Sequence, residues 1–117
     1  MNLEAFRAAC LAKKGVTEEQ PFGDETLVYK VVGKMFALTD IPDFASINIK
    51  CDPEKAVELR EKYDAVQPGY HMNKKHWNTV LIDGSLPDKL VLAWLHDSYE
   101  LVVAGLTKKE KSALDSF

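Results

Sequence analysis

Cysteine is scarce in this sequence, and what is missing around it is informative. The chain of 117 residues has two cysteines, Cys10 and Cys51, and no CxxC pair. A zinc ribbon requires paired cysteines and a thioredoxin-type site requires CxxC, so neither class fits. Isolated thiols are typical of small side chains that pack against a core. We therefore predict two buried or half-buried thiols, with no catalytic residue, bound metal or cofactor assigned.

Long apolar runs are also missing. No window approaches the roughly 18 apolar residues that a membrane span requires. The segment Met1–Arg7 lacks the basic residues and the apolar run of a signal peptide. We therefore expect a cytoplasmic protein without a membrane partner.

An excess of positive charge is the third absence. The formal net charge is −3, with 28% charged and 46% hydrophobic residues. These values are typical of a globular chain, and the length suits one domain over residues 1–117. Global attraction to nucleic acid is not predicted, although a local patch of cations can still bind it.

The hydrophobic periodicity predicts helices and strands along the whole chain. Helices are expected over 2–14, over 53–63, from 85–88 to a left-handed cap at Gly105, and over 108–114. Strands are expected over 26–31, 34–39, 45–50, 65–67 and 76–82. Val32-Gly33 is predicted to be a tight hairpin turn, and residues 17–24 a structured connection. The resulting order is α-β-β-β-α-β-β-α-α, an α+β fold with an antiparallel sheet and helices packed on one face.

Several short motifs occur in one order along this chain. They are Pro21-Phe22-Gly23, VVGKMFAL from Val31 to Leu38, Lys50-Cys51-Asp52-Pro53, the segment Pro68–Lys74 followed by His76-Trp77, and Asp97-Ser98-Tyr99. With these motifs the sequence resembles the MmcQ/YjbR family of small bacterial proteins. The resemblance implies a fold similar to bacterial frataxin, whose strand-and-loop elements have been described as a double wing and proposed to bind DNA.

The segment from Pro68 to Val80 is the richest in chemistry. The candidate binding residues are Tyr70, His71, Asn73, Lys74, Lys75, His76, Trp77 and Asn78. The lysines, the histidines and the nearby Arg60 and Lys62 could neutralise phosphates. The amides could hydrogen-bond to a backbone or base edge, and Tyr70 could stack on a base. The leading hypothesis is a small non-enzymatic protein that binds DNA through the loop from Tyr70 to Asn78.

Two other hypotheses remain open. In the first, Tyr70, His71, His76 and Trp77 line a pocket between the sheet and the long helix, which binds a small ligand or another protein. In the second, the two histidines act as acid–base catalysts or metal ligands, although no third ligand or carboxylate stands at motif spacing. Trp77 and the residues up to Ile82 are also consistent with a purely structural role in the core.

Overall fold

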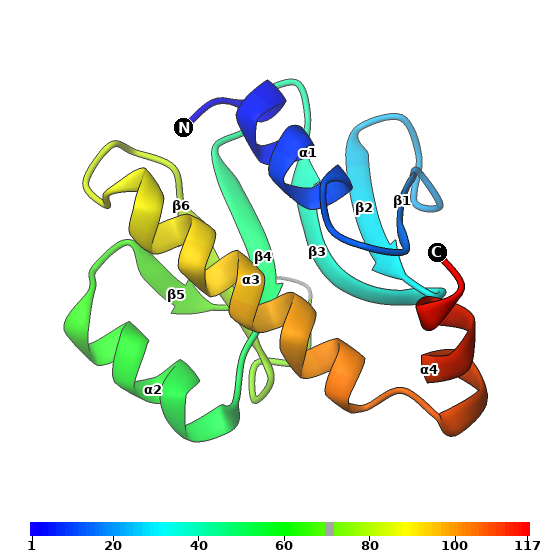
Figure 1. Ribbon diagram of the computed structural model, residues 1–117. Coiled ribbons are helices and arrows are strands. Elements are labelled where there is room, and N and C mark those ends of the chain that lie inside the picture. Colours follow the sequence, from blue (N-terminus) through cyan, green and yellow to red (C-terminus); the bar gives the residue numbers. More distant parts are fainter. Residues whose placement is uncertain (70–71) are drawn as a thin grey trace.

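The computed structural model describes residues 1–69 and 72–117 of the chain, and Figure 1 shows its elements. The helices are α1 (Leu3–Leu11), α2 (Pro53–Lys62), α3 (Asp88–Ala104) and α4 (Lys108–Asp115). The strands are β1 (Val16–Glu19), β2 (Thr26–Val31), β3 (Lys34–Asp40), β4 (Ser46–Lys50), β5 (Val66–Pro68) and β6 (Trp77–Leu81). They form one sheet in the order β1-β2-β3-β4-β6-β5, and all neighbouring strands are antiparallel. The predicted α+β class is confirmed.

Strand β1 corrects the predicted order, which had no strand before residue 26. Thr17 pairs with Lys30 and Glu18 pairs with Tyr29 in the register of β1 and β2. Glu18 also accepts hydrogen bonds from Arg7 on α1 and from the Tyr29 hydroxyl, at 2.7 to 2.9 Å. These contacts are distant in sequence, and they outweigh the local capping pattern that predicted a turn.

The helix boundaries agree with the prediction at the starts better than at the ends. The caps Asn2 and Asp52 accept hydrogen bonds from backbone N–H groups, and Thr107 forms the predicted capping box with Glu110. Helix α1 ends at Leu11, before the expected residue 14. Gly105 has φ −88°, so the predicted left-handed cap of α3 is wrong.

The hairpin turn between β2 and β3 is confirmed. Val32 and Gly33 have φ of 47° and 78°, the positive values that a two-residue type I′ turn requires at both positions. Glycine adopts this conformation without strain, whereas a β-branched valine does so at a steric cost.

The sheet has a helix-covered face and a face that carries a smaller cluster. Helix α3 runs across the sheet in Figure 1. The main core includes Phe6 of α1, Tyr29 and Phe36 of the sheet, and Leu95 of α3, each at most 1% exposed. A separate buried cluster contains Val28, Leu38 and Trp77, with Met35 and Met72 packed against it.

Strands β3 and β4 separate beside the buried residue Ser98 of α3. Their pairing ends at Ala37 and Ile49, and the next residues along are Phe36 and Lys50. The Ser98 hydroxyl donates to the Phe36 carbonyl at 2.6 Å and accepts from the Lys50 N–H at 2.8 Å. One serine hydroxyl therefore replaces the hydrogen bond that these two strands no longer make with each other.

The residues on either side of Ser98 contact other parts of the fold. The Asp97 carboxylate pairs with Lys55 of α2 at 3.0 Å, and the Tyr99 hydroxyl donates to the Lys14 carbonyl at 2.6 Å. Three consecutive residues of α3 thus join α2, the sheet and the connection after α1.

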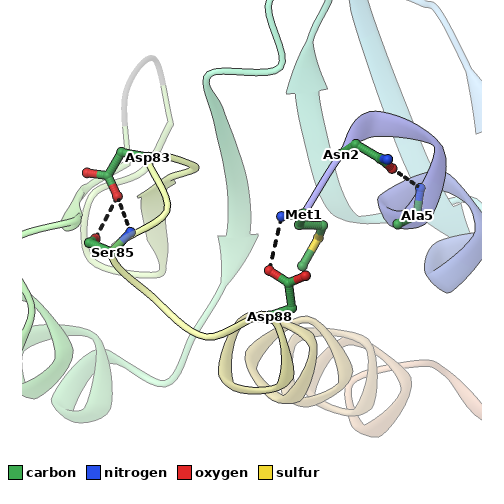
Figure 2. Close-up of polar contacts among 6 residues, drawn as sticks. All are labelled: Met1, Asn2, Ala5, Asp83, Ser85 and Asp88. Atoms are coloured by element: carbon green, nitrogen blue, oxygen red, sulfur yellow. Dashed lines mark hydrogen bonds and ion pairs between the residues drawn. The ribbon is translucent and has the colours of Figure 1, made fainter.

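Polar contacts also fix the connection from β6 to α3 (Figure 2). The Asp83 carboxylate accepts from the Ser85 hydroxyl at 2.6 Å and from the Ser85 N–H at 2.9 Å. These hydrogen bonds lower the pKa of Asp83. The amino group of Met1 donates to Asp88 in the first turn of α3 at 3.0 Å, which favourably places a carboxylate at a helix N-terminus.

Candidate functional site

The predicted binding residues divide into exposed and buried groups in the segment that joins β5 to β6. Asn73, Lys74 and Lys75 are exposed, and His76 is half-buried. Trp77 and Asn78 are 8% and 1% exposed, so neither presents its side chain to a large ligand such as DNA. Tyr70 and His71 lie outside the described residues.

Arg60 of α2 holds this segment in place. Its guanidinium donates to the carbonyls of Lys74 and Trp77 and to the Asn78 side-chain oxygen, the last at 2.7 Å. The Lys74 ammonium in turn donates to the Gly69 carbonyl at 3.0 Å. Two of the cations that the sequence suggested for phosphate binding therefore make structural hydrogen bonds.

Gly69 allows the segment to approach β6 closely. A Cβ atom at this position would lie 2.8 Å from both the Cβ and the carbonyl oxygen of Trp77. Only glycine fits without displacing the strand, because the Gly69 N–H donates to that same carbonyl at 2.9 Å.

Trp77 lies on the sheet face opposite the main core, which corrects the position predicted for this residue. It pairs with Lys50 across β4 and β6 and packs in the cluster with Val28 and Leu38. The next residue, Asn78, points to the helix-covered face, where its amide donates to the Ala56 carbonyl at 3.4 Å. Trp77 therefore cannot line a pocket between the sheet and α3.

A different cavity, of about 140 Å³, lies between the sheet, α2 and α3. Its apolar wall comes from strands and from both helices, and consists of Ile49, Leu59, Val66, Val80, Trp94 and Leu101. Its polar lining consists of Lys50, Cys51, Asp52, Lys55, Asn78 and Asp97. Of the six predicted binding residues that the structure describes, only Asn78 lines this cavity.

Two side-chain contacts connect α2 and its C-cap to α3 around the cavity. Lys55 and Asp97 form an ion pair in which the two side chains are 46% and 56% exposed. The rings of Tyr63 and Trp94 meet edge to face, with their centroids 5.3 Å apart. The cavity is thus bordered by an exposed, solvent-screened ion pair and by an aromatic pair.

The electrostatics of the lining favour binding over nucleophilic chemistry. Burial raises the pKa of the Cys51 thiol, so the thiol stays protonated at neutral pH.

Every buried side-chain nitrogen and oxygen within residues 1–69 and 72–117 has a hydrogen-bond partner. Over the same residues, no three histidine, cysteine or acidic side chains are grouped to hold a metal ion. In this part of the chain, no helix combines the length and apolar character needed to cross a membrane.

Only some of the cavity residues belong to patterns that can be recognised in the sequence. Cys51, Asp52 and Asp97 stand in the motifs that carry the family resemblance, and Leu59 stands in the apolar stripe of α2. No spacing rule links these residues, because they come from separate elements that meet only in the fold. The ion pair between Lys55 and Asp97 spans 42 positions.

Comparisons with known proteins agree with this architecture. The model of the YjbR family matches residues 11–101. The chain is 40% identical over 92 residues to the protein YbdF of Escherichia coli O157:H7, covering 78% of this chain and 75% of that protein. It is 30% identical over 115 residues to YjbR of Escherichia coli K12, covering 97% and 98% of the two chains. The crystal structure of the Deinococcus radiodurans protein DR2400 matches with a TM-score of 0.89 and 43% identity, over 97% of this chain and 88% of that chain. The chain therefore belongs to the YjbR family.

Proposed function

We propose that this protein is a non-enzymatic binding protein that holds a small, mainly apolar molecule in the cavity between α2, α3 and the sheet. The observation that carries this proposal is the composition of the cavity wall. Six apolar side chains, among them Leu59 and Trp94, surround about 140 Å³. A cavity of about 150 Å³ with a similar apolar lining accepts benzene in another protein, so one aromatic ring fits this volume.

The fold provides a built-in comparison for testing this proposal. Trp94 lines the cavity, whereas Trp77 packs on the other face of the sheet. The two indole N–H signals can be followed in ¹⁵N-labelled protein during a titration with 2-phenylethanol. We expect the Trp94 signal to shift in a saturable way while the Trp77 signal stays in place. No shift of Trp94 at about 10 mM ligand, where a millimolar affinity would be visible, would overturn the proposal.

A pair of substitutions on α2 tests the location. Leu59→Phe adds a ring to the cavity wall and should abolish the Trp94 shift. Val57→Phe adds the same ring on the same helix, at a position that is 48% exposed and outside the lining. We expect Val57→Phe to bind as the unmodified protein does. Equal binding by the Leu59→Phe variant would place the ligand elsewhere.

A second candidate function is DNA binding through the exposed part of the β5–β6 segment. Asn73, Lys74 and Lys75 are consecutive and exposed, which favours contacts to phosphates. With two lysines available, log K should fall with log salt at a slope of about −2 on duplex DNA. Titration of duplex and single-stranded DNA at several salt concentrations measures this slope. Absence of binding at about 50 mM salt, where such contacts are strong, would exclude this candidate.

Lys75→Gln is the informative variant for this candidate, because Lys74 also supports the segment through Gly69. We expect the salt slope to become shallower by about 1 in Lys75→Gln. Lys89→Gln removes an exposed lysine at the start of α3 and serves as the control. An equal effect of both variants would show that only the total charge matters.

A further inference from the structure

The inner part of the cavity and its mouth differ in the polar groups that a ligand can contact. The one polar side chain deep in the lining, Asn78, already bonds to Arg60 and to the Ala56 carbonyl. A polar ligand atom placed there would lose its hydrogen bonds to water and would meet mainly apolar side chains. The inner part therefore favours an apolar group, and any polar group of the ligand belongs at the mouth.

The mouth carries more negative than positive charge. Among its lining residues, Asp52 and Asp97 are acidic and Lys55 is basic. Lys50 also borders the cavity, but it pairs with Trp77 across the sheet, and cross-strand partners point to the same face. Its ammonium therefore lies on the face opposite the cavity. Two more charged groups lie next to the lining, because Arg60 bonds to Asn78 and Glu58 acts on Lys55; their charges are opposite and leave the balance unchanged.

The charge of the ligand decides whether binding neutralises the excess negative charge at the mouth or increases it. A cationic ligand would bring the mouth to two carboxylates and two cations. An acidic ligand would instead place three carboxylates around the single ammonium of Lys55. The N-terminus of α2 offers no alternative site for an anion, because Asp52 already accepts from the N–H groups of Glu54 and Lys55.

We propose that the ligand is a hydrophobic amine, with its apolar body in the cavity and its ammonium beside Asp97. This inference rests on the proposed function, because it assigns a chemical class to the same cavity. The Lys55 side chain is 46% exposed, so its ammonium can move into water when the ligand amine pairs with Asp97. The carboxylates at the mouth favour an amine over an acid, and burial of the ring provides most of the affinity.

Three ligands of similar shape test the class. Phenethylamine, 2-phenylethanol and 3-phenylpropionate are titrated separately at pH 7 and low salt, with the Trp94 indole signal as the readout. We expect the amine to bind most tightly and the acid most weakly. The amine should exceed the acid by about threefold to tenfold, since each exposed charge contact contributes a factor of up to about five. The difference should shrink at high salt, because screening by ions weakens the interactions between exposed charges.

Two variants assign the effect to a residue. Asp97→Asn should reduce the ratio between amine and acid to near one while 2-phenylethanol still binds. Asp43→Asn removes an exposed carboxylate in the turn before β4, at the end of that strand remote from Lys50, and should leave the ratio unchanged. A ratio that persists in Asp97→Asn would overturn the assignment.

The outcomes separate the inference from the proposed function. If 2-phenylethanol binds but the acid binds as tightly as the amine, the amine class is wrong and the cavity remains a binding site. If none of the three ligands shifts Trp94, the proposed function fails and the inference fails with it.

Discussion

Replacing Ser98 with alanine tests whether its hydroxyl stabilises the place where β3 and β4 separate. The Ser98 hydroxyl satisfies both the Phe36 carbonyl and the Lys50 N–H, and Ser98 is 0% exposed. Alanine would leave two buried backbone groups without a partner. Each such group costs about 1–3 kcal/mol, and the strands can recover part of this by moving together. We therefore expect the free energy of unfolding to fall by about 3 kcal/mol.

Thermal and urea denaturation followed by circular dichroism measure this loss. For a chain of this size, about 3 kcal/mol corresponds to a decrease in Tm of about 10 °C. Ser112→Ala is the matched control, because Ser112 is exposed on α4, and its change should stay within about 0.5 kcal/mol. If Ser98→Ala is as stable as the control, the hydroxyl does not support the separation of the strands.

Three further predictions concern other polar groups of the fold. Arg60→Lys should lower the free energy of unfolding by about 2 kcal/mol, because an ammonium cannot reach all three acceptors. Urea denaturation measures this loss of stability. A loss no larger than that caused by Lys62→Gln would contradict the prediction. The Arg7 guanidinium lowers the pKa of the Glu18 carboxyl. Because the folded pKa lies below the unfolded value, this stabilisation is present above about pH 5 and lost as pH falls through the folded pKa. Glu18→Gln should therefore flatten the acid side of the stability profile, and an unchanged profile would refute the pairing. Burial raises the pKa of Cys10 to about 12, so at pH 8 iodoacetamide should label Cys51 slowly and Cys10 only after unfolding, as read by mass spectrometry; rapid labelling of Cys10 in the native protein would argue against its burial.

The sequence predicted those parts of the fold that depend on neighbouring residues. The caps at Asn2, Asp52 and Thr107 act within a few positions, and so does the turn at Val32-Gly33. Strand β1 depends instead on Arg7 and Tyr29, which a local pattern cannot bring together.

The candidate site was harder to predict for a related reason. Strand β6 carries bulky or buried residues on both faces, so the sequence indicated that Trp77 is buried but not on which side. The cavity also needs α2 and α3 to lie at a set distance over the sheet, which is a property of the assembled core. Leu59 and Trp94 could be predicted as apolar helix residues, but not as two walls of one space.

The triplet Asp97-Ser98-Tyr99 holds α3 in place more firmly than α2 is held, although both helices form walls of the cavity. Helix α3 cannot turn about its axis or slide without breaking bonds to β3, β4 and Lys14. Helix α2 is anchored by Arg60 near its C-terminal end, while its first turn is tied to α3 by the exposed pair of Lys55 and Asp97. The Asn78 amide also bonds to the Ala56 carbonyl, and only two residues join β4 to α2, so the start of α2 is held to the sheet as well. We therefore expect the mouth of the cavity to open by separation of the Lys55 and Asp97 side chains, while both helix backbones stay on the sheet.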